Sequence, residues 1–141
     1  MADEPVVVDT NIVFSILLAP ASPLRDALFR PGRRFLICET CLVELFRHRE
    51  KLLKLRPAFP PSRLEATFHA ILRQLDLYKE NSIGLDAWNR AEEYCRDVDP
   101  QDAPHVALTL EVDGLLWTGD KRLRRGLEAK GFDRFFTPDP E

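Results

Sequence analysis

The sequence predicts an α/β fold, a three-layer sandwich in which helices cover both faces of a central parallel sheet of about five strands. Helical and strand patterns alternate along the chain, which favours parallel strands joined by helical crossovers. The apolar runs Val6–Val8 and Leu115–Trp117 lack alternating polar residues, as expected for strands buried on both faces. Both runs end in polar and acidic residues, at the sheet edge where such folds bind ligands.

Helices and strands are predicted in a regular order. The helices that follow the apolar segment at residues 12–18 cover residues 22–30, 41–55, 64–75, 85–98 and 120–130, and the strands cover residues 6–8, 35–38, 77–78, 115–117 and 134–137. Thr40 is predicted to cap the helix at residues 41–55, and Gly131 to end the last helix. The inward stripe of the helix at residues 41–55 is predicted to comprise Leu42, Leu45, Phe46 and Leu52 or Leu53. With neither an internal repeat nor a linker, residues 1–141 form one domain with a frayed tail at residues 138–141.

Composition and charge exclude several classes of protein. The 45% hydrophobic and 30% charged residues are ordinary for a soluble chain, and a net charge of −3 gives no overall attraction to nucleic acid. The longest uncharged stretch, residues 10–24, is shorter and more polar than the roughly 20 apolar residues of a membrane span. The acidic N-terminus lacks the positive charge of a secretory signal, so we expect a cytoplasmic protein.

The three cysteines are an odd number, which argues against a disulfide framework. Cys38-x-x-Cys41 has the spacing of half a zinc site or of a redox pair, but only Cys95 remains as a further thiol. Structural thiols are therefore favoured over a zinc or redox role.

Three aspartates are predicted to converge at the carboxyl edge of the sheet. Asp9 and Asp120 follow two strands, and Asp102 begins a helical segment whose apolar residues share one face. Each is also a favoured helix N-cap, and Asp99 with Asp102 resembles a capping box. Capping is the better interpretation of any one of them, whereas their joint placement indicates a ligand site.

The ligand best matched to such a cluster is a hard divalent cation. Carboxylates that lie close together raise one another's pKa, so the cluster is unfavourable unless a cation binds there. Mg²⁺ and Mn²⁺ both favour carboxylate oxygen and water. This chemistry suits hydrolysis of a phosphodiester by metal-activated water, without a nucleophilic side chain.

Four short motifs carry a resemblance to a known family. In order and spacing, the chain resembles the PIN domain, and more narrowly the prokaryotic PIN-type toxin components of toxin–antitoxin pairs. The motifs are Val7-Val8-Asp9-Thr10-Asn11-Ile12-Val13, Glu39-Thr40-x-x-x-Glu44-Leu45, Asp99-x-x-Asp102-Ala103-x-x-Val106-Ala107-Leu108 and Leu116-Trp117-Thr118-Gly119-Asp120-Lys121.

The resemblance implies a metal-dependent ribonuclease that acts on single-stranded RNA with Mg²⁺ or Mn²⁺. The matching site residues are the acids Asp9, Glu44, Asp102 and Asp120 and the supporting polar residues Asn11 and Thr118. Glu44 comes from the resemblance alone, because its helical neighbours are basic and it could equally lie on a salt-bridged surface. Arg122 stands where many relatives carry a second acid, which weakens the case for a second metal ion. Asp99 is interpreted as an N-cap, and His105 as a residue that packs at the rim of the crevice.

Partners follow from the same resemblance. It implies a small antitoxin protein bound near the acidic crevice, and a homodimer, for which the apolar helices at residues 42–55 and 64–75 provide surface. A basic cluster directly after Asp120 is placed to hold RNA phosphates, although such clusters are often only solvated helix faces. Its members are Lys121, Arg122, Arg124 and Arg125.

Other functions remain as alternatives. A catalytically inactive PIN-like module that binds RNA or protein would keep the same acids. A receiver-type phosphoacceptor domain would need an aspartate after a central strand in mid-chain, and the segment Leu77-Tyr78-Lys79-Glu80 offers none. A phosphatase of the haloacid dehalogenase type would need a second aspartate at the position of Asn11.

Overall fold

The computed structural model describes residues 4–19, 22–49, 51, 54 and 61–138. Its strands are β1 (Val6–Val8), β2 (Phe35–Cys38), β3 (Leu75–Tyr78) and β4 (Leu115–Trp117). Its helices are α1 (Thr10–Leu18), α2 (Pro23–Phe29), α3 (Glu39–Arg47), α5 (Pro61–Leu72), α6 (Leu85–Cys95), α7 (Ala103–Glu111) and α8 (Lys121–Ala129), with short 3-10 helices η1 (Glu80–Ser82) before α6 and η2 (Pro100–Asp102) before α7.

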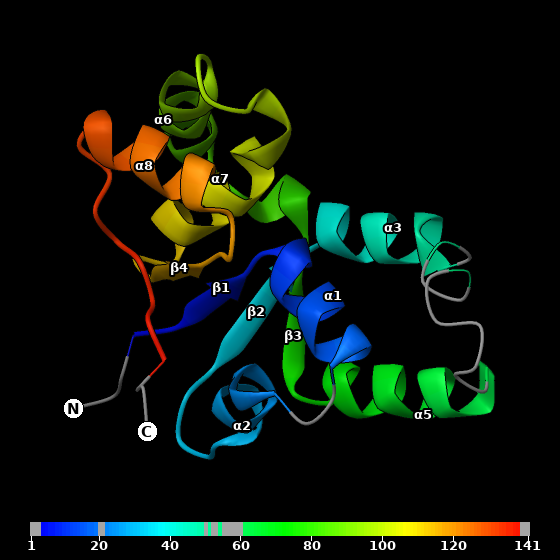
Figure 1. Cartoon of the computed structure of the whole chain (residues 1–141). Coiled ribbons are helices and arrows are strands. Elements are labelled where there is room, and N and C mark those ends of the chain that lie inside the picture. Colours follow the sequence, from blue (N-terminus) through cyan, green and yellow to red (C-terminus); the bar gives the residue numbers. More distant parts are fainter. Residues whose placement is uncertain (1–3, 20–21, 50, 52–53, 55–60, 139–141) are drawn as a thin grey trace.

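The strands of the described residues form one parallel sheet in the order β3-β2-β1-β4, flanked by helices (Figure 1). β1 is central, and its register places Val8 opposite Trp117 of β4. The amide of Asp9 donates to the carbonyl oxygen of Trp117 at 2.9 Å, so both strands end at the same edge. The predicted α/β sandwich is confirmed, and its carboxyl edge collects the residues that follow β1 and β4.

The fifth strand, predicted at residues 134–137, is reduced to one parallel bridge between Phe135 and Leu116. Leu116 donates to the carbonyl oxygen of Arg134 and accepts from the amide of Phe136, both at 2.8 Å. Pairing cannot extend through Pro138, because proline has no amide hydrogen to donate. The prediction was right in the place and direction of this segment and wrong in its extent: the sheet of the described residues has four strands.

The core explains why the strands could be recognised. Every residue of β1 and β2 is buried, which matches apolar runs without alternation. α7 packs across β1, β2 and β4, and its residues Val106, Ala107 and Leu108 are fully buried. The outer side of α7 packs against α6. The start of α7 is therefore fixed against the carboxyl edge of the sheet by its apolar face.

α3 differs most from its prediction. It begins at Glu39 with Cys38 as its N-cap and ends at Arg47, so the predicted cap at Thr40 and the predicted end at residue 55 are both wrong. Leu45 is buried and Leu42 is partly buried, but Phe46 is 63% exposed, and the predicted inward position of Phe46 is wrong. The reason is that α3 extends away from the sheet (Figure 1) and places Phe46 beside Phe68 of α5, with ring centroids 6.2 Å apart. Leu52 and Leu53 lie outside the described residues.

The remaining helix ends lie within three residues of their predictions. α5 covers residues 61–72 instead of 64–75, and Leu75 begins β3. α6 ends at Cys95, three residues before the predicted end, and α8 begins at Lys121 with Asp120 as its N-cap. Gly131 follows α8 with a φ of 94°, the left-handed conformation predicted for it. Residues 139–141 of the predicted tail lie outside the described part of the chain.

The cysteines are free and buried. Burial raises the pKa of the Cys41 and Cys95 thiols to about 12, which keeps both protonated at neutral pH. In the described part of the chain, no single helix has both the length and the apolar character to cross a membrane; α1 and α2 meet those criteria only as a bent pair.

Candidate metal centre

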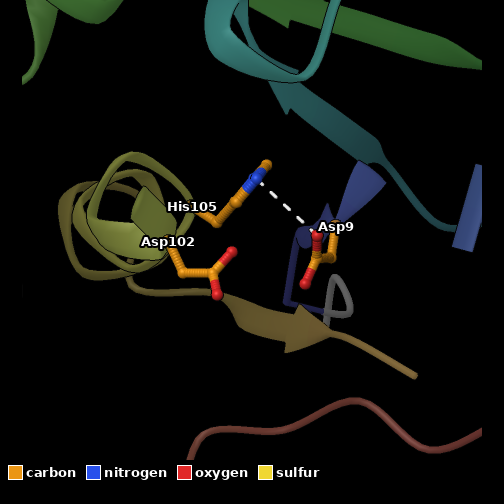
Figure 2. A group of neighbouring side chains, drawn as sticks. All are labelled: Asp9, Asp102 and His105. Atoms are coloured by element: carbon orange, nitrogen blue, oxygen red, sulfur yellow. Dashed lines mark ion pairs between the residues drawn. The ribbon is translucent and has the colours of Figure 1, made fainter. Parts of the chain in front are cut away.

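Three side chains from two parts of the chain meet at the carboxyl edge of the sheet. Asp9 follows β1, Asp102 ends η2, and His105 lies in the first turn of α7. Figure 2 shows them directed toward a common space. One carboxylate oxygen from each aspartate and one ring nitrogen of His105 all lie within 4.8 Å of one another. Of these residues, Asp9 and His105 are buried and Asp102 is partly buried.

Asp9 is held in place by the two polar residues predicted to support it. Thr118 Oγ1 donates to Asp9 Oδ2 at 2.8 Å, and Asn11 Nδ2 donates to the same oxygen at 3.3 Å. Asn11 Oδ1 in turn accepts from the Gly119 amide at 2.9 Å, which ties the loop after β4 to the start of α1. Asp9 makes no side-chain capping bond to α1. The Asp9 carboxylate is therefore oriented by Thr118 and Asn11 at the edge of the sheet, and not by capping of α1.

His105 is not at the rim of the crevice, as predicted, but is buried with 1% of its side chain exposed. Its Nε2 lies 3.6 Å from Asp9 Oδ1 and 3.7 Å from Glu44 Oε1, and its Nδ1 lies 3.5 Å from Cys38 Sγ. Burial alone would lower its pKa, but the contacts with Cys38 and Glu44 and the charge of Asp9 raise the pKa of His105 well above its usual value. The available sequence signal was a histidine three residues after Asp102 on an otherwise apolar helix face.

Glu44 points inward from α3 and not into a surface network. Thr10 Oγ1 donates to Glu44 Oε1 at 2.8 Å, and the same oxygen faces His105. The imidazole of His105 is the main cause that lowers the pKa of Glu44; burial opposes this shift, and the hydrogen bond from Thr10 adds to it. The structure thus brings Glu44 to the site, where it contacts the group of Asp9, Asp102 and His105 through His105.

Asp102 and Asp99 have different roles at the start of α7. Asp99 Oδ1 accepts from the Gln101 amide at 3.1 Å and caps η2, as predicted. Asp102 makes no side-chain capping bond. Burial, followed by the charge of Asp9, raises the pKa of Asp102 to about 7. The Asp102 carboxylate is therefore positioned without the usual stabilisation of a capping residue.

Asp120 lies at the same edge but caps α8. Its Oδ1 accepts from the amides of Arg122 and Leu123 at 3.0 and 3.1 Å. Its own amide donates to Thr118 Oγ1 at 3.1 Å, and Thr118 donates to Asp9. Asp120 is thus connected to Asp9 through one threonine, and the capping interpretation weighed for it from the sequence is observed.

The predicted RNA-binding cations divide into two kinds. Lys121, Arg122 and Arg125 are exposed on α8. Arg124 is partly buried: its guanidinium lies 4.8 Å from the centroid of the Phe135 ring and 3.8 Å from Glu128. Arg124 therefore already stabilises the fold, while its three neighbours present their charge to solvent.

The donor atoms fit a divalent cation. Mg²⁺ and Mn²⁺ bind carboxylate oxygens, and imidazole nitrogen suits the transition-metal ions. Burial is the main cause that raises the pKa of Asp102, and the charges of Asp9 and Asp99 add to it while His105 opposes it. Asp9 and Asp102 would hold such an ion, whose charge would remove their repulsion.

Comparison with known proteins adds the family and the fold. A family model described as PIN domain matches residues 7–136. Among solved structures, the chain is similar to one in VapBC2 from Rickettsia felis bound to a DNA fragment from their promoter, with a TM-score of 0.66 and 12% sequence identity. That match covers 85% of this chain and 91% of the other, and at this identity it shows the fold alone. No curated protein matches the sequence at a significant level.

We expect Asp102→Asn to stabilise the metal-free protein at neutral and alkaline pH. A raised pKa means that the folded state is most favoured while Asp102 is protonated, and that this stability is lost as the pH rises from about 4 through about 7. The variant avoids that loss. Because Asp102 is only partly buried and solvent screens part of the repulsion, the expected gain at pH 8 is on the order of 1–2 kcal/mol.

Urea unfolding in EDTA at pH 4 and at pH 8 checks this prediction, since the two proteins should differ only at the higher pH. Asp99→Ala is the control at pH 4, where Asp102 is protonated and carries no charge for Asp99 to repel: it removes an observed cap and should lower stability by about 1 kcal/mol. An Asp102→Ala variant that loses as much stability as Asp99→Ala would mean that Asp102 is a capping residue, since asparagine caps as well as aspartate.

Proposed function

Since this chain belongs to the PIN domain family, we propose that it is a metal-dependent endoribonuclease that cleaves single-stranded RNA by metal-activated water. The observation that carries this proposal is the pair of carboxylates, Asp9 and Asp102, directed toward each other at the carboxyl edge of the sheet (Figure 2). Burial, with the charge of Asp9 as a second cause, raises the pKa of Asp102 to about 7, and a bound divalent cation would favour its ionised form.

We assign Mg²⁺ or Mn²⁺ to Asp9 and Asp102, with Glu44 and Asp120 as the further acids of the site. When bound, the ion lowers the pKa of a water molecule and offsets the negative charge that develops on the phosphate. Thr118 fixes Asp9 through Oδ2, while Oδ1 faces the common space with His105. The lowered pKa of Glu44 keeps its carboxylate ionised across the neutral range.

The exposed cations on α8 supply an RNA-binding surface next to this site. Lys121 and Arg122 directly follow Asp120, and Arg125 lies one turn after Arg122, so all three stand in the first two turns of the helix that Asp120 caps. Arg124 contributes less, because it packs on Phe135. Positive side chains at this position would offset the repulsion between RNA phosphates and the acidic edge.

We further propose that the chain is the toxin of a toxin–antitoxin pair and forms a homodimer. The surface we favour for the homodimer lies between α3 and α5. A small apolar pocket of about 50 Å³ there is lined in part by Leu45, Leu64 and Phe68. Phe46, which also lines this pocket, is 63% exposed, and Val43 of α3 is 48% exposed. An exposed apolar patch of this kind favours a protein interface. The fold similarity to VapBC2, observed bound to promoter DNA, supports a comparable pair.

We expect the purified protein to cleave single-stranded RNA in Mg²⁺ or Mn²⁺ and to leave 5′-phosphate ends, because the attacking group is water and not the RNA 2′-hydroxyl. Asp102→Asn should lower the cleavage rate at least 100-fold while the protein stays folded. Gel assays with end-labelled RNA of defined sequence measure the cleavage rate and identify the product ends. Full activity in EDTA, or products with 2′,3′-cyclic phosphate, would contradict the proposal; RNA binding without cleavage would support the inactive-module alternative.

Removal of exposed cations on α8 should weaken RNA binding in a salt-dependent manner. For Arg122→Ala combined with Arg125→Ala, the slope of log affinity against log salt should decrease in magnitude by about 1 to 1.5, as expected for two lost phosphate contacts to a single strand. The matched control is Arg34→Ala with Arg73→Ala, which removes two charges near the amino ends of β2 and β3. Equal slopes in wild type and the α8 variant would make these arginines a solvated face.

Phe46→Glu should weaken self-association if the face between α3 and α5 is the dimer interface, because it places a charge on an apolar contact surface. Light scattering of the wild type at micromolar concentration should give the mass of a dimer, and the variant that of a monomer. Leu85→Glu is the control, since Leu85 is exposed on α6. A monomeric wild type would exclude the homodimer. The antitoxin is tested separately, by whether addition of that protein inhibits RNA cleavage.

A further inference from the structure

We propose that His105 is a protein ligand of the metal ion through Nε2, and that the resulting set of one nitrogen and two carboxylates makes the site bind Mn²⁺ in preference to Mg²⁺. The inference rests on the proposed metal site but goes beyond it, because the four acids alone do not distinguish these ions. It concerns a residue that the sequence motifs did not assign to the site.

The distances around His105 indicate a shared ligand better than direct hydrogen bonds. Nε2 lies 3.6 Å from Asp9 Oδ1 and 3.7 Å from Glu44 Oε1, beyond the usual limit of about 3.2 Å for such a bond. Two atoms that bind one ion at about 2.1 Å lie about 3 Å apart when adjacent and about 4 Å apart when opposite. One donor atom from each of Asp9, Asp102 and His105 lies within 4.8 Å of the other two, so these three residues would hold the ion together.

The helix geometry places Asp102 and His105 on one face. They are three residues apart at the start of α7, and this spacing puts both side chains on the same side of the helix, opposite Asp9 (Figure 2). The neighbours of His105 on α7, such as Val106 and Ala107, are fully buried and apolar. The polar contacts of this buried ring explain its place: Nε2 faces the carboxylates of Asp9 and Glu44, which are themselves candidate ligands of the ion.

The other ring nitrogen has the support that a metal-binding histidine needs. Nδ1 lies 3.5 Å from Cys38 Sγ at the end of β2, a contact that fixes the orientation of the ring. Metal binding would displace the proton from Nε2, and the proton kept on Nδ1 would leave the lone pair of Nε2 directed at the space between the carboxylates. Cys38 is buried, so this orienting contact is excluded from solvent.

The choice of ion follows from the nitrogen donor. Mg²⁺ binds oxygen almost exclusively and loses its water reluctantly, whereas imidazole suits first-row transition ions. Replacing an oxygen ligand by imidazole therefore favours Mn²⁺ relative to Mg²⁺. We expect wild type to bind Mn²⁺ at least tenfold more tightly than Mg²⁺.

Pulsed electron paramagnetic resonance of bound Mn²⁺ tests the ligand directly. With the untagged protein, the spectrum should contain modulation from a coordinated ¹⁴N, and ¹⁵N-histidine labelling of wild type should convert it to the ¹⁵N pattern. His105→Gln places an amide oxygen near the position of Nε2 and should abolish the modulation. The controls His48→Gln and His69→Gln should retain it.

Titration calorimetry with each ion gives the second readout. His105→Gln should reduce the preference for Mn²⁺ over Mg²⁺ to about threefold or less, while both controls keep the wild-type ratio. Mn²⁺ bound without nitrogen modulation in labelled wild type would overturn the inference and leave the proposed nuclease intact, with His105 only a counterion of Asp9 and Glu44. No binding of either ion to wild type would overturn both. The labelling result needs no variant, so it stands even if His105→Gln fails to fold.

Discussion

The burial of Asp9 at the end of the central strand is the constraint on which this edge of the molecule depends. A carboxylate with 4% of its surface exposed must be hydrogen-bonded or paired. Thr118 supplies a hydrogen bond from the end of β4, Asn11 supplies one from the start of α1, and His105 faces it from α7. Because these partners come from three elements, satisfying one side chain fixes how β4, α1 and α7 meet.

Burial and the nearby charge of Asp9 both disfavour the ionised form of Asp102. Its carboxylate faces Asp9 and has no capping bond to offset burial. The apolar face of α7 holds it there, since Val106 to Leu108 are fully buried against the sheet. Core packing thus offsets an electrostatic repulsion, which is a common relation between stability and function at catalytic sites. The same packing keeps His105 out of solvent.

Some parts of this arrangement could be predicted from sequence, and others depend on contacts that no local pattern contains. Strands β1 and β4 were recognisable because parallel strands buried on both faces are continuously apolar, and Asp9 follows from the end of β1. His105 was misplaced because helical spacing shows which residues share a face but not which strand that face meets. Glu44 looked like a surface acid for the same reason: its partners, Thr10 and His105, are distant in sequence. The short fifth strand has a local cause that the sequence does contain: Pro138 has no amide hydrogen with which to extend the pairing to β4.

Capping and metal binding were hard to separate in sequence because the fold makes them coincide. In parallel α/β folds, helices begin just after the carboxyl ends of strands, and the partial positive charge of each helix N-terminus favours an acid there. α1, α7 and α8 all begin at this edge, next to Asp9, Asp102 and Asp120. Only atomic contacts distinguish a capping aspartate from the others. The Asp120 carboxylate accepts from backbone amides of α8, whereas the carboxylates of Asp9 and Asp102 make no capping bond to α1 or α7. Both capping bonds of Asp120 use Oδ1, so capping does not by itself exclude a role for this acid at the proposed metal site.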